Sequence, residues 1–234
     1  GMVWVTNKQS WSISVIDPAT LAINRTIGLP RASQPHGLVM APAGDVAYVA
    51  LEATGQVRRY ATGSYALLAT ANVGASPRHL SVSADGASVF VSRFITPPLP
   101  GEATAVVVPN AATGGEVLQL TASTMTAGST VVLKHSDRPD DEAQGRGIPN
   151  YLGAMAISPD GTQAYVPSKQ DNVQRGALRD GTGLNFQSTV RAVSSRVALP
   201  ALSEDPAERI DHDNASLASA ALYDRRGVYL FVAL

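Results

Sequence analysis

The sequence predicts an all-β fold, specifically a β-propeller built of four-stranded antiparallel blades. Two observations lead to this prediction: the composition, and a hairpin pattern that recurs along the chain. The 234 residues include 20 Gly and 15 Pro but few aromatic residues, which suits many short strands joined by tight turns. The second observation gives the blade, because self-similarity at a fixed period is the signature of repeat architectures.

Each copy of the hairpin pattern is an apolar strand, a polar turn that usually contains Gly, and a second strand of aromatic and Val residues. Gly in such a turn supplies the positive-φ position that a tight hairpin needs, and alternation on either side gives each strand one buried face. The four copies span residues 35–50, 77–92, 153–167 and 218–232.

Two further strands are expected after each hairpin. After a strand at 3–7 the chain continues through 12–17 and 22–28, and after the first hairpin through 56–60 and 66–74. Roughly 40 residues and four short strands per unit is the spacing of a propeller blade. Residues 1–234 are therefore predicted to form a single propeller segment, an incomplete ring of about four blades.

The expected ring is incomplete because the chain opens at the second strand of one blade and stops two strands into another. Propellers close by pairing strands from both ends, so that no sheet edge stays exposed. Either the natural chain continues, or a homodimer completes a ring of about eight blades.

Several of these residues resemble a known repeat. Trp4–Asn7, Val15–Thr20, Ile27–Gly28 and the turn Ser158–Gly161 are similar to the YVTN-type repeat of surface-layer and periplasmic propellers. The resemblance implies the propeller fold and a periplasmic or cell-surface location. Any signal peptide is expected to lie outside this segment, because no basic-then-apolar stretch follows Gly1 and Met2.

A weaker likeness concerns the second half of the chain. Residues 171–176, 179–181 and 186–192 are similar to propeller domains found upstream of di-haem cytochrome-c-peroxidase-like domains. The di-haem domains attach haem through Cys-x-x-Cys-His motifs, and this chain has no Cys. The resemblance implies that any haem would belong to a different domain.

Composition argues against several classes of partner. Charged residues make up 16% of the chain and the formal net charge is −1, so no broad positive field is expected to hold nucleic acid. No apolar run approaches the roughly 20 residues of a membrane-spanning helix, so no membrane span is predicted.

Three stretches depart from the repeat and are predicted to be insertions or loops: residues 95–102, 124–150 and 200–214. Carboxylates in the second stretch could bind Ca²⁺ through oxygen, although their spacing matches no EF-hand loop. The third stretch offers carboxylate and imidazole ligands. Solvated loops and turn capping are the alternatives for these candidate metal ligands, which are Asp137, Asp140, Asp141, Glu142, Asp211, His212 and Asp213.

His36 and His79 occupy nearly the same point of successive hairpins, so a propeller would bring both to one face of its central channel. They could bind copper or zinc, or each could fix a backbone carbonyl in the turn between blades. Arg78, next to His79, could bind a carboxylate or phosphate. His36, Arg78 and His79 are therefore the candidate ligand-binding residues.

No catalytic motif stands out, since the nucleophile-elbow, phosphate-loop, zinc-protease and dinucleotide patterns are all missing from the sequence. The sequence predicts a non-catalytic binding or scaffold propeller of the cell envelope. Its partner would be a protein or a small molecule, and no cofactor is expected within the segment besides Ca²⁺. The alternative is the propeller domain of a redox protein whose haem or metal centre another domain supplies.

Overall fold

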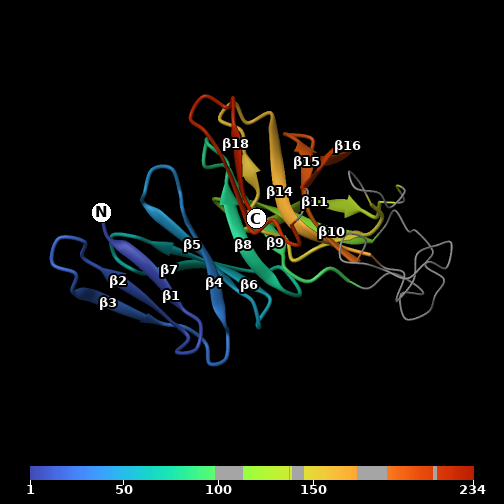
Figure 1. Cartoon of the computed structure of the whole chain (residues 1–234). Coiled ribbons are helices and arrows are strands. Elements are labelled where there is room, and N and C mark those ends of the chain that lie inside the picture. The colour runs from blue at the N-terminus through green and yellow to red at the C-terminus, as the bar shows by residue number, and fades with distance from the viewer. Residues whose placement is uncertain (98–112, 137, 139–144, 173–188, 213–214) are drawn as a thin grey trace. The chain divides into compact units, whose positions relative to one another are not determined.

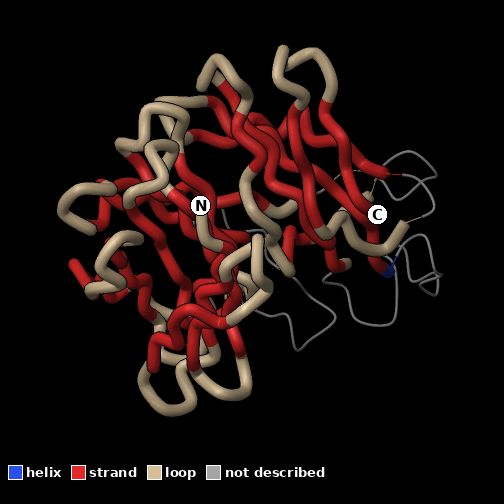
Figure 2. The backbone as a smooth tube through the Cα atoms, turned by 90° about the vertical axis from the view of Figure 1, so that its left-hand side faces the viewer, coloured by secondary structure: helices blue, strands red, loops and turns tan. Residues whose placement is uncertain are grey.

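The computed structural model describes residues 1–97, 113–136, 138, 145–172, 189–212 and 215–234. These residues form strands, turns and loops, and the strands dominate (Figure 1, Figure 2). They make up two compact units, one of residues 1–92 and 118–128 and the other of residues 93–117 and 129–234.

The first unit is built of consecutive sheets whose strands follow one another in sequence order. The first sheet contains β1 (Val3–Asn7), β2 (Ser12–Ile16) and β3 (Ile23–Gly28). The second contains β4 (Pro35–Met40), β5 (Val46–Leu51), β6 (Gln56–Ala61) and β7 (Leu67–Asn72). The third contains β8 (Pro77–Val82), β9 (Ser88–Arg93), β10 (Gly114–Thr121) and β11 (Thr126–Lys134), and its last two strands continue into the second unit.

Strand β5 shows how these sheets stack, because all six of its residues are buried. Successive side chains of a strand point to opposite faces. Tyr48 faces one hydrophobic cluster together with Leu80 of β8, and Val49 faces another together with Trp4 of β1. The second sheet is therefore covered on both faces, which is the arrangement of neighbouring propeller blades.

The predicted Gly turns are confirmed. In each, the Gly amide donates to the carbonyl three residues earlier, and its φ lies in the left-handed region that Gly adopts without strain. The four are Gly44 (φ 74°), Gly86 (φ 71°), Gly161 (φ 69°) and Gly227 (φ 72°).

Gly37 has a different role, which is to let two sheets approach. A β-carbon at this position would lie 2.3 Å from the backbone oxygen of Arg78 in β8. Gly153 in the second unit repeats the feature, since a β-carbon there would lie 2.9 Å from the oxygen of Ser219. The Gly residues at the start of the first and third hairpins, Gly37 and Gly153, therefore leave room for close packing.

The second unit contains a sheet in the order β12-β14-β15-β16, with β13 also paired to β14, and a separate two-stranded sheet. The strands of the larger sheet are β12 (Ile148–Asn150), β13 (Ala156–Ile157), β14 (Gln163–Asp171), β15 (Val190–Ala198) and β16 (Ser203–His212). The smaller sheet pairs β17 (Ala220–Tyr223) with β18 (Leu230–Ala233), as the fourth hairpin predicted.

Two of the predicted insertions contain strands. Strands β11 and β12 occupy much of 124–150, and β16 occupies most of 200–214. Strand β16 lies at the end of its sheet and carries a register irregularity opposite Ser194 and Arg196. An edge strand with a bulge tolerates Pro206 and many charged residues, which is why its sequence looked like a loop. Most of the remaining stretch, 95–102, lies outside the described residues.

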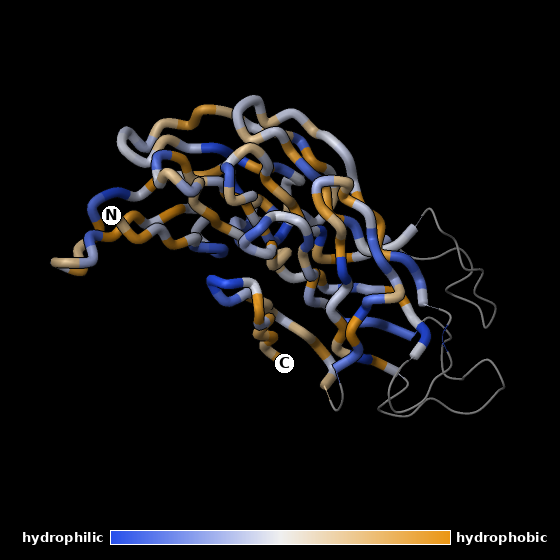
Figure 3. The backbone as a smooth tube through the Cα atoms, turned by 90° about the horizontal axis from the view of Figure 1, so that it is seen from above, coloured by the Kyte–Doolittle hydropathy of each residue, from blue (hydrophilic) through white to orange (hydrophobic). Residues whose placement is uncertain are grey.

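Antiparallel sheets, most of three to five strands, that follow one another along the chain confirm the fold class: a β-propeller with an incomplete ring. Strands β17 and β18 carry exposed apolar side chains, including Leu222 and Phe231, which are 70% and 63% exposed. Figure 3 shows this hairpin beside the C-terminus as hydrophobic strands joined by a hydrophilic turn. Within the described part of the chain, no helix has the length and apolar character that crossing a membrane requires.

Candidate functional site

The first unit brings His36 and His79 together, as the repeat predicted. His36 lies in β4 and His79 in β8, and the centroids of their rings are 5.0 Å apart in an edge-to-face arrangement. The register between β4 and β5 shifts between Pro35 and Leu38, so His36 and Gly37 form a bulge. Bulges redirect side chains, and at this one a β-carbon on Gly37 would meet the backbone of β8.

Both imidazoles are held neutral near pH 7. Burial lowers the pKa of His36 below its usual value, and the positive charge of Arg78 lowers it further. Burial, followed by His36 and then Arg78, lowers the pKa of His79 to about 4. Glu52 acts in the opposite direction on both groups but does not offset burial.

Glu52 supplies a carboxylate to this site, and it contacts two cations. Its Oε2 atom lies 3.0 Å from Nζ of Lys8 and 3.6 Å from Nε of Arg78. The Glu52 and Arg78 side chains are only 16% and 19% exposed. We call the five residues Lys8, His36, Glu52, Arg78 and His79 the histidine cluster.

An open groove of about 610 Å³ adjoins the histidine cluster, and Glu52 is part of both. The groove runs between the β5–β6 turn and the segment that joins β7 to β8. Its other lining residues are Ala53, Thr54, Gly55, Asn72, Gly74, Ala75 and Ser76. The groove gives a small molecule access to the carboxylate end of the cluster.

Sequence reasoning missed Lys8 and Glu52, although the repeat contains a signal for them. Each is the first residue after a strand that leads into a four-residue turn, and both turns end on a positive φ, at Trp11 (49°) and Gly55 (65°). Aligning the turns as well as the strands would have placed the opposite charges at equivalent positions of successive blades.

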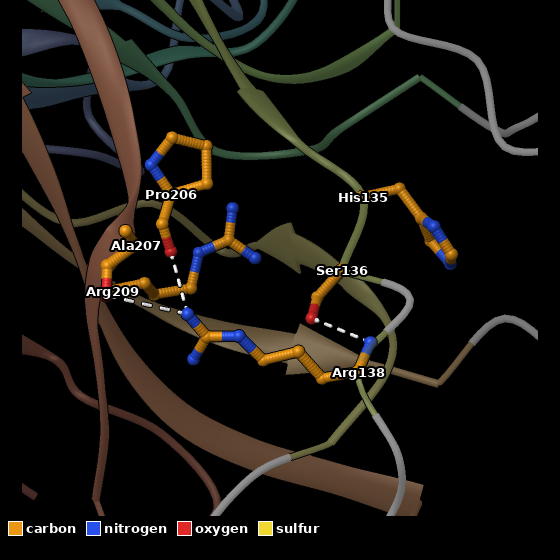
Figure 4. A pocket seen from close by; sticks show the side chains of 6 residues that line it. All are labelled: His135, Ser136, Arg138, Pro206, Ala207 and Arg209. Carbon is orange, nitrogen blue, oxygen red and sulfur yellow. Dashed lines mark hydrogen bonds between the residues drawn. The ribbon is translucent and has the colours of Figure 1, made fainter.

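A second cavity, of about 250 Å³, lies in the second unit and is lined by His135, Ser136, Arg138, Pro206, Ala207 and Arg209 (Figure 4). We call it the arginine pocket. Both guanidinium groups bond to protein acceptors. Arg138 donates to the oxygen of Pro206 at 2.9 Å, and the buried Arg209 donates to Gln170 at 3.0 Å and to the oxygen of Lys134 at 2.7 Å.

Arg209 also pairs with Glu204, and both side chains are almost fully buried. Protein groups bind the Arg209 guanidinium and neutralise its charge, so we infer that this side chain mainly holds β16 against the end of β11. The arginine pocket is therefore a weaker candidate for ligand binding than the histidine cluster.

The candidate metal ligands of the third stretch lie on β16. Asp211 is 3.8 Å from Nη1 of Arg138, whereas Nε2 of His212 is 2.9 Å from the hydroxyl of Ser194. Neighbouring residues of a strand point to opposite faces, so these two side chains do not converge. Burial lowers the pKa of His212.

The other acidic candidates, Asp137, Asp140, Asp141, Glu142 and Asp213, lie outside the described residues. Among the residues that are described, no three His, Asp or Glu side chains are grouped so that they could hold a metal ion. A Ca²⁺ or transition-metal site remains a prediction from the sequence.

The fold and site together define a class: a propeller segment with a polar cluster where two blades meet. Comparison with known proteins found no matching family model and no matching curated protein. The similarities are to solved structures, and they show the fold alone because every identity is low.

Hydrazine synthase from Kuenenia stuttgartiensis is 12% identical, with a TM-score of 0.55, and the match covers 99% of this chain and 70% of that one. A candidate 6-phosphogluconolactonase from Bacteroides uniformis is 14% identical, with a TM-score of 0.62 and coverages of 99% and 60%. Virginiamycin B lyase from Staphylococcus aureus is 11% identical, with a TM-score of 0.57 and coverages of 99% and 59%. The chain thus spans about 60% of the length of the last two proteins.

Proposed function

We propose that this chain is the binding segment of a non-catalytic propeller of the cell envelope, and that its ligand site is the histidine cluster. The observation that carries the proposal is the approach of His36 and His79, from successive sheets, to a ring separation of 5.0 Å beside Arg78. Desolvating three polar side chains costs free energy that a purely structural contact between blades could avoid with apolar residues.

The surroundings of the cluster suit binding. Hydrophobic clusters cover both faces of the second sheet. Strands β4, β5 and β8 therefore form a rigid base for the side chains at their ends. Binding residues placed on a rigid scaffold lose little entropy when a ligand arrives. The adjoining groove gives that ligand a path to Glu52.

Among the described residues, a hydroxyl–imidazole pair that could resemble a nucleophile with its base supports the proposed lack of catalysis. Ser194 contacts His212 at 2.9 Å, but Ser194 is completely buried and cannot reach a substrate from solvent. The envelope location is supported only by the resemblance to YVTN-type repeats. Fractionation of cells that produce the full natural protein checks it, and recovery in the cytoplasm would contradict it.

The alternative proposal, support of a haem or metal centre on another domain, rests on the likeness of residues 171–176, 179–181 and 186–192 to propellers that precede di-haem domains. An absorption spectrum of the full natural protein, purified from its own host, distinguishes the two. A haem band would favour the redox function.

Calorimetric titration tests the binding proposal. Wild-type protein is titrated with carboxylates, phosphates, neutral sugars and Zn²⁺, alongside the double variant His36→Gln/His79→Gln. The matched control is His212→Gln, which also removes a half-buried imidazole but lies in the second unit. We expect one ligand class to bind wild type and the control, with at least a roughly tenfold loss, about 1.4 kcal/mol, in the double variant. Equal binding by all three proteins would refute the site.

A further inference from the structure

The five side chains of the histidine cluster meet at one end of their strands. Lys8 follows β1, Glu52 follows β5, and His36, Arg78 and His79 lie at the beginnings of β4 and β8. The carboxylate of Glu52 contacts the cations of Lys8 and Arg78. Arg78 and Glu52 act on both imidazoles, and Lys8 acts on His36. The cluster is thus one electrostatic unit.

The charges of this unit do not balance. With both imidazoles neutral, the five described side chains of the cluster include two cations and one carboxylate, so together these five carry one positive charge in excess. Arg78 and Glu52 are mostly shielded from water, which strengthens their interactions relative to those of exposed groups. A bound anion would neutralise the excess, whereas a metal cation would increase it.

We propose that the histidine cluster binds a small oxyanion, a carboxylate or phosphate, and takes up a proton on His79 or His36 as it does so. This inference rests on the proposed binding function and adds the ligand class and its coupling to pH. Arg78 provides the guanidinium geometry that suits oxyanions, and the neighbouring imidazoles provide hydrogen-bond donors once protonated.

The direction of the coupling follows from the charges that face the imidazoles. Among the described charges, Arg78 and Lys8 oppose protonation of His36, and His36 and Arg78 oppose protonation of His79, while Glu52 favours protonation of both. An oxyanion beside them adds negative charge and raises both pKa values. A proton is therefore bound with the anion, and by linkage the anion binds more tightly as the pH falls.

The size of the effect has an upper limit. For uptake of one proton, Kd decreases by at most about tenfold per pH unit between the pKa of the free imidazole and that of the complex. For His79 the lower end of this interval is about 4. Affinity should therefore rise through the range from about pH 8 to about pH 5, where histidines change charge.

Histidine-selective NMR tests the inference, because the chain contains only four His. Protein labelled on its histidine rings is titrated with sodium phosphate, and separately with sodium acetate, at several values between about pH 5 and pH 8. His36→Gln and His79→Gln assign the two signals. The site variant is Arg78→Gln, and the matched control is Arg138→Gln in the arginine pocket.

We expect at least one of the anions to shift the His36 and His79 signals toward their protonated positions and to bind more tightly at lower pH. Arg78→Gln should weaken binding by roughly tenfold or more and Arg138→Gln should leave it unchanged. Response to phosphate alone or acetate alone identifies which oxyanion the site accepts.

Two results would overturn the inference. Binding of an anion or of a neutral ligand at the cluster with the same Kd across this pH range would remove the proton coupling but leave the proposed binding function intact. No response of either histidine to either anion would exclude the ligand class, and the calorimetric panel, which includes neutral sugars and Zn²⁺, would then decide whether the cluster binds anything.

Discussion

Replacing Gly37 with Ala tests the packing on which the histidine cluster depends. The added β-carbon would lie 2.3 Å from the Arg78 oxygen and 3.1 Å from the His79 α-carbon, whereas ordinary contact begins near 3.4 Å. Both obstructing atoms belong to the backbone, so no side chain can rotate away. Strand β4 must therefore move from β8 by about 1 Å at this point.

Overpacking of this kind costs about 1–3 kcal/mol, and the rigid backbone on both sides favours the upper part of that range. The matched control is Gly28→Ala in β3, where a β-carbon would meet nothing within 4 Å and no positive φ is required. That substitution should be neutral or stabilise by up to about 1 kcal/mol.

Urea and thermal unfolding, followed by circular dichroism, measure both variants. For a chain of this size a loss of about 2–3 kcal/mol lowers Tm by roughly 4–12 °C. The separation of His36 and His79 should also change, which the histidine NMR signals would report. If Gly37→Ala unfolds within about 0.5 kcal/mol of wild type, the close approach of β4 and β8 is not as described.

Three further predictions concern pH, a buried ion pair and assembly. Because burial lowers the His79 pKa from 6.5 to about 4, the unfolded chain binds a proton in this interval that the folded chain does not, so stability falls as the pH drops through it. The loss should approach roughly 3 kcal/mol below about pH 4, and His79→Gln should remove it in urea titrations at several pH values. Glu204→Ala leaves the buried Arg209 without its carboxylate and should lower the free energy of unfolding by about 3–5 kcal/mol. Asp205→Ala, which breaks the more exposed pair with Arg196, should lower it by less than about 1 kcal/mol. Equal losses in the two variants would contradict this account. Light scattering should give about twice the 24.3 kDa chain mass, because the exposed Leu222 and Phe231 of β17 and β18 favour a homodimer that completes the ring, and a stable monomer would argue against it.

Most of the strands of the first unit could be predicted from the sequence, because local chemistry determines them. Gly44 and Gly86 must adopt a positive φ, and the alternating residues on either side of each turn fix which face is buried. The same reasoning found the β17–β18 hairpin from its turn at Gly227.

Strand β16 could not be predicted in this way. Its residues include Pro206 and many charged side chains, which are typical of loops. What makes it a strand is its pairing with β15 and the burial of Arg209 against Gln170 and Glu204. The contact with Gln170 joins residues 39 positions apart, which the local sequence does not reveal.

The candidate site was predictable in part. The repeat placed His36 and His79 at equivalent positions, and the structure brings them together. The ion pairs of Glu52 with Lys8 and Arg78 depend on how three sheets pack, and the sequences of the individual hairpins do not predict that packing. Asp211 and His212, adjacent in sequence, separate because a strand alternates its side chains.

Mapping backbone amide shifts on adding sodium phosphate near pH 6 is the most direct test of where this protein binds a ligand. Our account predicts that the largest changes fall at residues 36–37, 52–55 and 76–79, the histidine cluster and its groove. Changes centred instead on residues 135–138 and 206–209, the arginine pocket, would contradict it.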